Sequence, residues 1–159
     1  MMMKKINRTY YLGCVALTLI IGFIADHYTT SDIKIWYYDL DKPYFEPPNW
    51  LYKLAWFLSF AGMGGALYHL LTAKKGPKRT QALTAFTVMM VLAFSWSFIF
   101  FNFKELDLAA LIMVFTWIAV SLLLLRSRRV SMAAVYHLIP AFLWATFGVV
   151  ATWAFWQLN

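Results

Sequence analysis

Residues 36–65 have the sequence WYYDLDKPYFEPPNWLYKLAWFLSFAGMGG, and this stretch decides the fold. A polar, aromatic segment ends at the Pro47–Pro48 pair, and a long apolar run follows it directly. Proline is tolerated in the first turn of a helix, so we expect a helix to begin just after Pro48. The apolar run is long enough to cross a bilayer core, which needs about 20 residues. The stretch therefore predicts a membrane helix that is preceded by an ordered loop.

The composition of the whole chain agrees with this local pattern. Of its 159 residues, 62% are hydrophobic and 13% are charged, against roughly 45–50% and 25% in soluble domains. A soluble domain of this length could not bury so much apolar surface, so the composition predicts an integral membrane protein. The single cysteine, Cys14, excludes an internal disulfide and a metal cluster made of cysteines.

Four further apolar runs complete the architecture. We expect transmembrane helices at about residues 9–27, 49–73, 80–103, 106–126 and 132–157. Residues 28–48 are expected to form a long structured loop between the first two helices. The predicted fold is an all-α integral membrane protein, a single domain over residues 1–159 built as a bundle of five transmembrane helices.

The charges alternate along the chain in phase with these spans. Most of the 14 Lys and Arg lie at the amino end and in the second and fourth connections, whereas the first and third connections carry the acidic residues. The positive-inside rule then places the amino end on the basic, cytoplasmic-like side, and we expect a bacterial cell membrane. The same rule and contact with the lipid bilayer explain the net charge of +7, so nucleic acid is not an expected partner.

The loop at residues 28–48 is too aromatic to be a disordered connection. Its aromatic residues after position 35 are Trp36, Tyr37, Tyr38, Tyr44 and Phe45. Such a loop forms either a lid over a ligand site or part of an aromatic belt at the level of the lipid headgroups. The lid is favoured because the prolines stiffen the return of the loop to the bundle.

Residues for acid–base or metal chemistry are sparse. No span has a charged residue near its middle, which argues against ion-coupled transport and leaves no acid–base pair inside the bundle. His27, His69 and His137 do not have the spacing of metal ligands, so no metal site is expected. Two interpretations of His137 stay open, a haem ligand or a hydrogen-bonded histidine near the membrane interface.

Large rings and small residues recur at helical spacing on three of the expected helices. Together with the aromatic loop, these faces predict a site for a large planar apolar ligand, with ordinary packing as the alternative. A second stripe of small residues would either close the bundle or form a dimer contact. The ring faces are Trp56, Phe60 and Met63; Trp96 and Phe100; and Trp144 between Ala141 and Gly148; the small-residue stripe is Ser59, Gly62, Gly65 and Ala66.

The loop and the ring faces resemble the tryptophan-rich sensory protein/translocator protein family (TspO/MBR, the peripheral benzodiazepine receptor family). The family pattern WY-x-x-L-x-KP-x-x-x-PP is matched by residues 36–48, and W-x-x-x-[YF]-x-x-MG by residues 56–64. Residues 96–101 match WS-x-x-FF, and Pro140, Trp144 and Phe147 match P-x-x-x-W-x-x-F. The resemblance covers about residues 10–159.

The resemblance implies a five-helix bundle, often a homodimer, that binds porphyrins (tetrapyrroles) and benzodiazepine-site ligands beneath the first loop. It implies no cofactor, since porphyrin or haem would be the ligand. The macrocycle would stack on Trp56 and Trp144, with its propionates near Lys34 and Lys42. Ala93, Ala141, Ala151 and Thr152 replace residues of the family pattern, so the site is expected to be roomier and more apolar. By position, the ligand-binding residues are Trp36, Tyr37, Pro47, Trp56, Phe60, Trp96, Trp144, Phe147 and Gly148.

Three functions remain open at this point. The first is a membrane receptor or carrier for tetrapyrroles. The second is an enzyme for light- or oxygen-dependent porphyrin degradation, in which Trp56 and Trp144 would donate electrons to the excited ring. The third is a helix-packing partner protein without a small ligand, which rests only on the small-residue stripe of the second helix.

Overall fold

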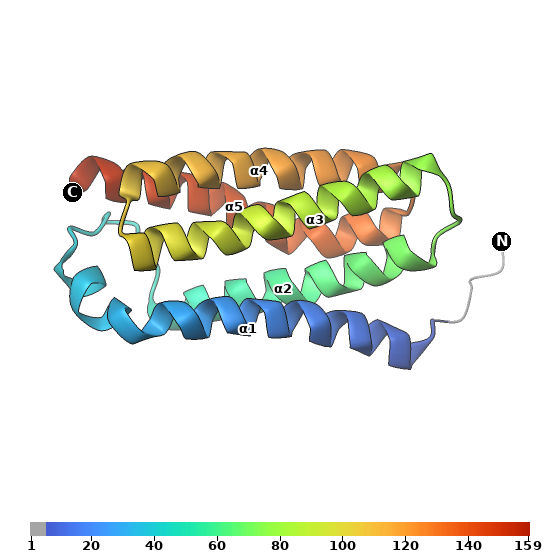
Figure 1. Cartoon of the computed structure of the whole chain (residues 1–159), viewed down its shortest axis with the longest axis horizontal. Coiled ribbons are helices and arrows are strands. Elements are labelled where there is room, and N and C mark those ends of the chain that lie inside the picture. The colour runs from blue at the N-terminus through green and yellow to red at the C-terminus, as the bar shows by residue number, and fades with distance from the viewer. Residues whose placement is uncertain (1–5) are drawn as a thin grey trace.

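The computed structural model describes residues 6–159, except for the side chains of residues 28–35. The chain forms an all-helical bundle whose first helix begins at the end opposite to the carboxyl terminus (Figure 1). The helices are α1 (Arg8–Asp39), α2 (Asn49–Thr72), α3 (Pro77–Phe98), the π-helix η1 (Ile99–Phe103), α4 (Leu106–Arg128) and α5 (Met132–Leu158).

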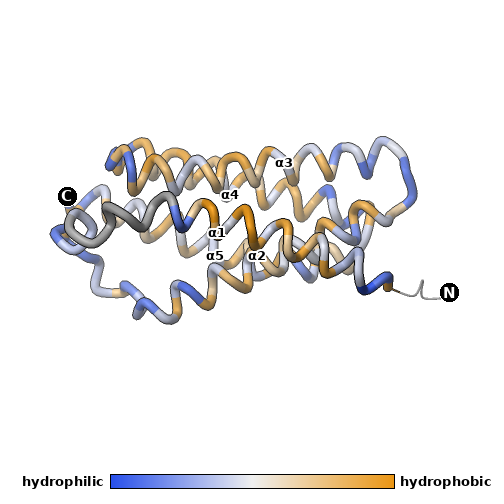
Figure 2. The backbone as a smooth tube through the Cα atoms, turned by 60° about the horizontal axis from the view of Figure 1, so that its bottom comes forward, coloured by the Kyte–Doolittle hydropathy of each residue, from blue (hydrophilic) through white to orange (hydrophobic). Residues whose placement is uncertain are grey.

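Within residues 6–159, five segments are long and apolar enough to cross a membrane, which confirms the predicted fold class. They are Arg8–His27, Asn49–Thr72, Pro77–Phe103, Leu106–Arg128 and Met132–Leu158. The hydropathy of the backbone trace is highest along the middle of the helices and falls at the connections (Figure 2). This pattern fits a bundle that lies across the bilayer with its polar ends in the two interfaces.

The first connection differs from the expected loop at residues 28–48. Helix α1 continues to Asp39, so only residues 40–48 are non-helical. The physical reason is local: residues 28–39 contain no glycine or proline to stop the helix, whereas Pro43, Pro47 and Pro48 follow in close succession. We call residues 40–48 the proline segment. The predicted lid is therefore a helical extension, about 18 Å long at 1.5 Å per residue, followed by this short segment.

Local sequence signals account for the ends of several helices. The Asn7 side chain accepts a hydrogen bond from the Tyr10 N–H at 3.2 Å and so caps α1. Pro77 occupies the first turn of α3, where its missing N–H costs nothing. The third span ends in the wider π turn η1, and Lys104 then adopts a left-handed conformation with φ 60°. Such π turns are frequent at functional sites.

Helix α2 packs against both α1 and α5, and its glycines make these contacts possible. A Cβ atom on Gly62 or Gly65 would overlap the His137 backbone or ring on α5, and one on Gly64 would overlap the α1 backbone at Val15. The small-residue stripe of α2 therefore closes the bundle within one chain. This answers the choice left open by the sequence and removes the feature on which a helix-packing partner function rested.

Candidate functional site

The candidate site lies at the end of the bundle where the proline segment crosses from α1 to α2 (Figure 1). Asn159 attaches this segment to the end of α5. The Asp41 N–H donates to Asn159 Oδ1 at 2.8 Å, and Asn159 Nδ2 donates to the Asp41 carbonyl oxygen at 3.1 Å. Asn159 Nδ2 also donates to the Phe155 carbonyl oxygen at 3.0 Å. These contacts hold the proline segment close to α5.

A first group of rings, the Phe100 cluster, comprises Phe100, Trp36, Tyr37, Trp96 and Phe155. Phe100 is only 2% exposed and lies in the π turn η1. Trp96 stacks on it at 5.2 Å between ring centroids, and Trp36 contacts it edge-on at 5.7 Å. Tyr37 lies 6.4 Å away and Phe155 5.7 Å away. The cluster brings together three of the residues expected at the site, Trp36, Tyr37 and Trp96.

The indole N–H of Trp96 is unusual within this cluster. Its Nε1 atom is buried and has no hydrogen-bond partner in the part of the chain that the structure describes. A buried donor without an acceptor costs free energy, about 1–3 kcal/mol. A ligand that places a carbonyl or carboxylate oxygen at this N–H would recover that energy.

A second group, the Trp144 cluster, comprises Trp144, Phe147, Tyr52 and Phe45. Trp144 stacks on Phe147 at 5.2 Å with an interplanar angle of 22°. Tyr52 from α2 contacts Trp144 edge-on at 5.3 Å and Phe147 at 6.1 Å. Phe45 of the proline segment contacts Phe147 at 6.4 Å. The cluster therefore joins α2, α5 and the proline segment around Trp144 and Phe147, two further residues expected at the site.

Tyr37 connects the two clusters. Its ring belongs to the Phe100 cluster, and its hydroxyl donates to Glu46 Oε1 at 2.5 Å and also interacts with Tyr52 of the Trp144 cluster. Burial raises the pKa of Tyr37 far above its ordinary value, and the neighbouring Glu46 and Tyr52 raise it further. Tyr37 therefore stays neutral and keeps its hydrogen available for donation.

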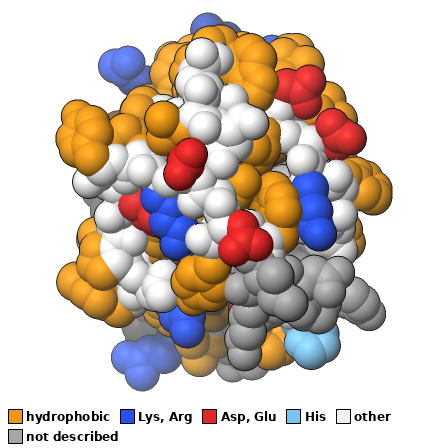
Figure 3. Space-filling model, turned by 90° about the vertical axis from the view of Figure 1, so that its left-hand side faces the viewer, with side chains coloured by type: hydrophobic (Ala, Val, Ile, Leu, Met, Phe, Trp, Pro, Cys, Tyr) orange, Lys and Arg blue, Asp and Glu red, His pale blue; other side chains and the backbone are white. Residues whose placement is uncertain are grey.

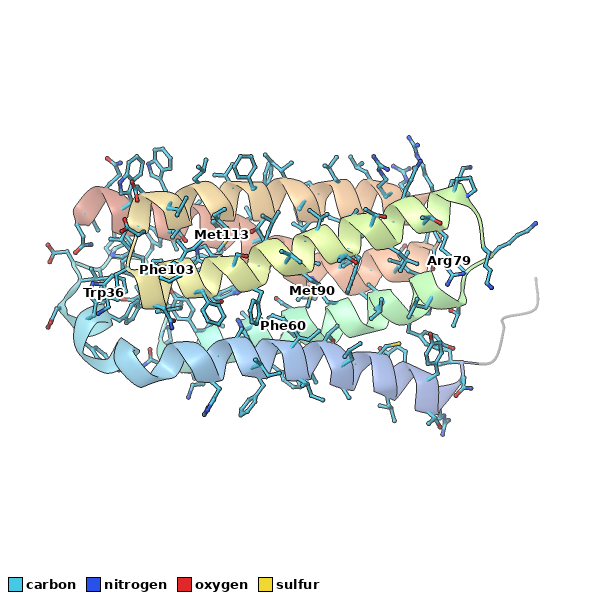
Figure 4. The ribbon with its side chains drawn as sticks, in the orientation of Figure 1. Trp36, Phe60, Arg79, Met90, Phe103 and Met113 are labelled. Carbon is cyan, nitrogen blue, oxygen red and sulfur yellow. The ribbon has the colours of Figure 1, made fainter. Side chains whose placement is uncertain are left out.

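The remaining expected residues are packed against other side chains of the bundle. Trp56 and Phe60 form a ring pair with centroids 4.3 Å apart, and a Cβ atom on Gly22 of α1 would lie 2.7 Å from Trp56 and 2.8 Å from Phe60. Phe60 lies in the middle of the bundle, away from Trp36 at the site end (Figure 4). Pro47 is partly buried in the proline segment.

The space beside Gly148 is occupied. A Cβ atom on Gly148 would lie 3.0 Å from both Cε and Sδ of Met113 on α4. The sequence indicates a gap next to Trp144, and the structure fills that gap with a thioether side chain. Methionine is flexible, with three rotatable side-chain bonds, so the Met113 side chain has other rotamers available to it.

Sequence reasoning missed five residues of the site. Tyr52 precedes Trp56 by four residues, so its place on the same helix face was available from the spacing. Phe45 was expected only as an aromatic residue of the loop, and Glu46 lies within the loop pattern, but neither was expected to contact the other site residues. Met113 and Phe155 had no signal in the sequence, because only packing between helices brings them to the site.

Two lysines stand over rings at this end of the bundle. Lys42 Nζ lies 5.0 Å from the ring centroid of Tyr37 and 4.7 Å from that of Tyr38. Lys104 Nζ lies 5.8 Å from the ring centroid of Trp36. The Lys34 side chain is outside the described residues. Viewed from this end, basic and acidic side chains are interspersed with hydrophobic ones (Figure 3).

The histidines near the opposite end form a separate group. His137 Nδ1 lies 2.8 Å from the Ala133 carbonyl oxygen, so it is the donor there, and Nε2 accepts a hydrogen bond from the Tyr11 hydroxyl at 3.1 Å. His69 lies beside this ring, with centroids 5.1 Å apart. Both nitrogens of His137 are therefore engaged by the protein, which favours the hydrogen-bonded interpretation over haem ligation.

Fold and site together define a multi-pass integral membrane protein with an aromatic site at one end of a five-helix bundle. The chain belongs to the TspO/MBR family, whose model matches residues 14–157. It is 32% identical to the tryptophan-rich protein TspO of Chlorobaculum tepidum, over 92% of this chain and 93% of that protein. It is 31% identical to the TspO protein of Archaeoglobus fulgidus, over 93% and 95%. It is 24% identical to the translocator protein of Bos taurus, over 93% and 89%.

Proposed function

We propose that this protein is a membrane receptor or carrier for planar apolar ligands of the tetrapyrrole class, and that benzodiazepine-site ligands fit the same site. Its family includes relatives named translocator protein and tryptophan-rich sensory protein, which supports a receptor or sensor role in the membrane. The observation that carries the proposal is the joining of the Phe100 and Trp144 clusters by Tyr37 beneath the proline segment.

The chemistry of the two clusters matches such a ligand. Aromatic side chains offer flat apolar faces, and a porphyrin with roughly 400 Å² of apolar face gains on the order of 10 kcal/mol at 25 cal/mol/Å² before ordering costs are subtracted. The unpaired Trp96 N–H would bind an acceptor atom of the ligand. Lys42, which is exposed at the same end, would bind a propionate.

The packing also suggests how the ligand gains room. Met113 would leave its position against Gly148, and the ligand would take its place beside Trp144. The Trp56–Phe60 pair, which is held by Gly22, would remain as the inner boundary of the site. In this arrangement Trp144 and Phe147 contact the ligand directly, whereas Trp56 and Phe60 contact only a ligand that penetrates deeply.

The orientation and the assembly are part of the proposal. The basic end carries the amino terminus and lies on the cytoplasmic-like side of a bacterial membrane, so the site opens toward the other side. A homodimer is proposed from the family resemblance. Because α5 covers Gly62 and Gly65 of the small-residue stripe of α2, the dimer contact would use another face of the bundle.

A titration with protoporphyrin IX in the dark, followed by tryptophan fluorescence, tests the proposal. We expect saturable quenching in the purified protein. Trp96→Phe keeps the ring and removes the N–H donor, so it should weaken binding about fivefold or more. Quenching that does not saturate would contradict the proposal. Subsequent illumination separates binding from degradation, because only an enzyme would bleach the bound porphyrin and yield a new product.

A further inference from the structure

A groove runs between α3 and α4 on the outside of the bundle, away from the aromatic site. It has a volume of about 540 Å³, within the range of sites that hold small molecules, about 300–1,000 Å³. Most of its lining is apolar, and its polar residues, Thr80, Gln81, Thr84 and Arg126, lie toward one end. The lining residues on α3 are Thr80, Gln81, Thr84, Ala85, Val88 and Leu92, and those on α4 are Phe115, Ile118, Ala119, Leu122 and Arg126.

The polar end of the groove lies at the basic end of the bundle. Because α3 and α4 are sequential helices joined by a short connection, they run in opposite directions, and Arg126 in the last turn of α4 lies level with the first turns of α3. Gln81, in those first turns, also lines the groove. Both side chains are exposed and carry N–H donors. The groove therefore offers a cationic, hydrogen-bond-donating head and an apolar body.

No carboxylate is available to neutralise this head. All seven acidic residues lie within residues 26–46 and 105–107, which belong to the opposite end of the bundle. None of the described lining residues is acidic. Arg79, in the first turn of α3, is also at the basic end (Figure 4), and its buried Nε has no partner among the described residues. The counter-charge for the groove must therefore come from another molecule.

The length of the groove matches one leaflet of a bilayer. From Thr80 to Leu92 the helix rises about 18 Å at 1.5 Å per residue, and half of a bilayer core is about 15 Å. A molecule with an anionic head at Arg126 would therefore extend its tail past Val88 and Ile118 toward the middle of the membrane. We propose that the α3–α4 groove is a binding site for one anionic phospholipid of the leaflet at the basic end.

A second copy of this chain fits the groove less well. In a two-fold dimer within one membrane, the axis is parallel to the membrane normal, so the two Arg126 side chains lie at the same depth. A contact at this groove would bring like charges together without a carboxylate between them. The walls contain Ala85 and Ala119, but they also carry large side chains such as Leu92, Phe115 and Leu122, which hinder the close approach of another helix.

Native mass spectrometry of the purified full-length protein tests the site, with phosphatidylglycerol and phosphatidylcholine of identical acyl chains as probes. We expect one phosphatidylglycerol to bind about fivefold or more tightly than phosphatidylcholine, since one basic residue near the surface has an effect of this size. Arg126→Gln should abolish that preference. Arg128→Gln is the matched control, because Arg128 is exposed at the same end but does not line the groove. It should change the preference less than about twofold.

A second pair of variants tests the apolar body of the groove. Val88 is 48% exposed and lines the groove, whereas Val91 is 58% exposed on the same helix and does not. Val88→Trp should fill the groove and remove the bound phosphatidylglycerol, and Val91→Trp should leave it in place. Equal affinity for the two lipids, or unchanged lipid binding in Val88→Trp, would overturn the proposal. If Val88→Trp instead separated a dimer without loss of lipid, the groove would belong to a second copy of the chain.

Discussion

The Tyr37 hydroxyl donates a hydrogen bond to the Glu46 carboxylate, and this contact joins the last turn of α1 to the proline segment. The donor is a partly buried phenol, and this burial holds its pKa far above the ordinary value for tyrosine. Because the neutral form is the donor, the hydrogen bond persists as the pH rises through the neutral and mildly alkaline range. Tyr37 and Glu46 thus hold the proline segment, which covers the site, against the end of α1.

Removal of the Tyr37 hydroxyl should loosen the proline segment. In Tyr37→Phe the Glu46 carboxylate loses its donor, at a cost of about 1.5–3 kcal/mol for a hydrogen bond to a charged group. We expect faster amide hydrogen exchange in residues 40–48 and weaker porphyrin binding, with the helices unchanged. Tyr38→Phe is the control, because Tyr38 is 59% exposed. Exchange at the proline segment that is the same in both variants would contradict this role of Tyr37.

The ring of Trp144 should be the main ligand contact on α5. Trp144→Ala removes the ring that stacks on Phe147 and faces Tyr52, so we expect porphyrin affinity to fall about tenfold or more. Trp153→Ala is the matched control on the same helix, because Trp153 is 51% exposed and has Trp156 as its ring neighbour. Dark titrations of both folded variants measure the difference. Equal affinities in the two would remove Trp144 from the site.

Adding a single methyl group at Gly65, where α2 lies against α5, should destabilise the protein. In Gly65→Ala the new Cβ would overlap the His137 ring, and we expect a loss of about 1–3 kcal/mol, as for other overpacked contacts. At Gly13 of α1 a Cβ meets nothing within 4 Å, so Gly13→Ala should be neutral or stabilise by up to about 1 kcal/mol. Thermal unfolding in detergent compares the two variants. Equal melting temperatures would show that α2 and α5 can move apart at Gly65 without loss of stability.

The attachment of the proline segment to α5 depends on Asn159. Asn159→Ala removes both hydrogen bonds to Asp41. At about 0.5–1 kcal/mol for each exposed bond, we expect residues 40–48 to open roughly 5- to 30-fold more often. Gln157→Ala, two residues earlier and also exposed, is the control. Hydrogen exchange resolved by peptide measures the opening. A segment as protected as in the parent chain would mean that Phe45 and Glu46 suffice to hold it.

Motifs in the sequence predicted many of the candidate site residues, and the structure shows which of them lie together. Trp36, Tyr37 and Trp96 meet around Phe100, and Trp144 stacks on Phe147. Trp56 packs with Phe60 against Gly22 of α1 and does not join either the Phe100 cluster or the Trp144 cluster. Spacing along one helix places rings on a common face, but it does not say which neighbouring helix that face meets.

The sequence by itself determined the five membrane spans, the alternation of charge between their connections and the family to which the chain belongs. These are local properties, because the length of an apolar run and the position of a proline act within one helix or one turn. Tertiary structure alone decided that Met113 fills the space beside Gly148, that Tyr37 joins two aromatic clusters and that α3 and α4 leave a groove. Those contacts depend on how each helix is rotated and shifted against its neighbours. Side-chain packing across the whole bundle sets these quantities, and no single segment encodes them.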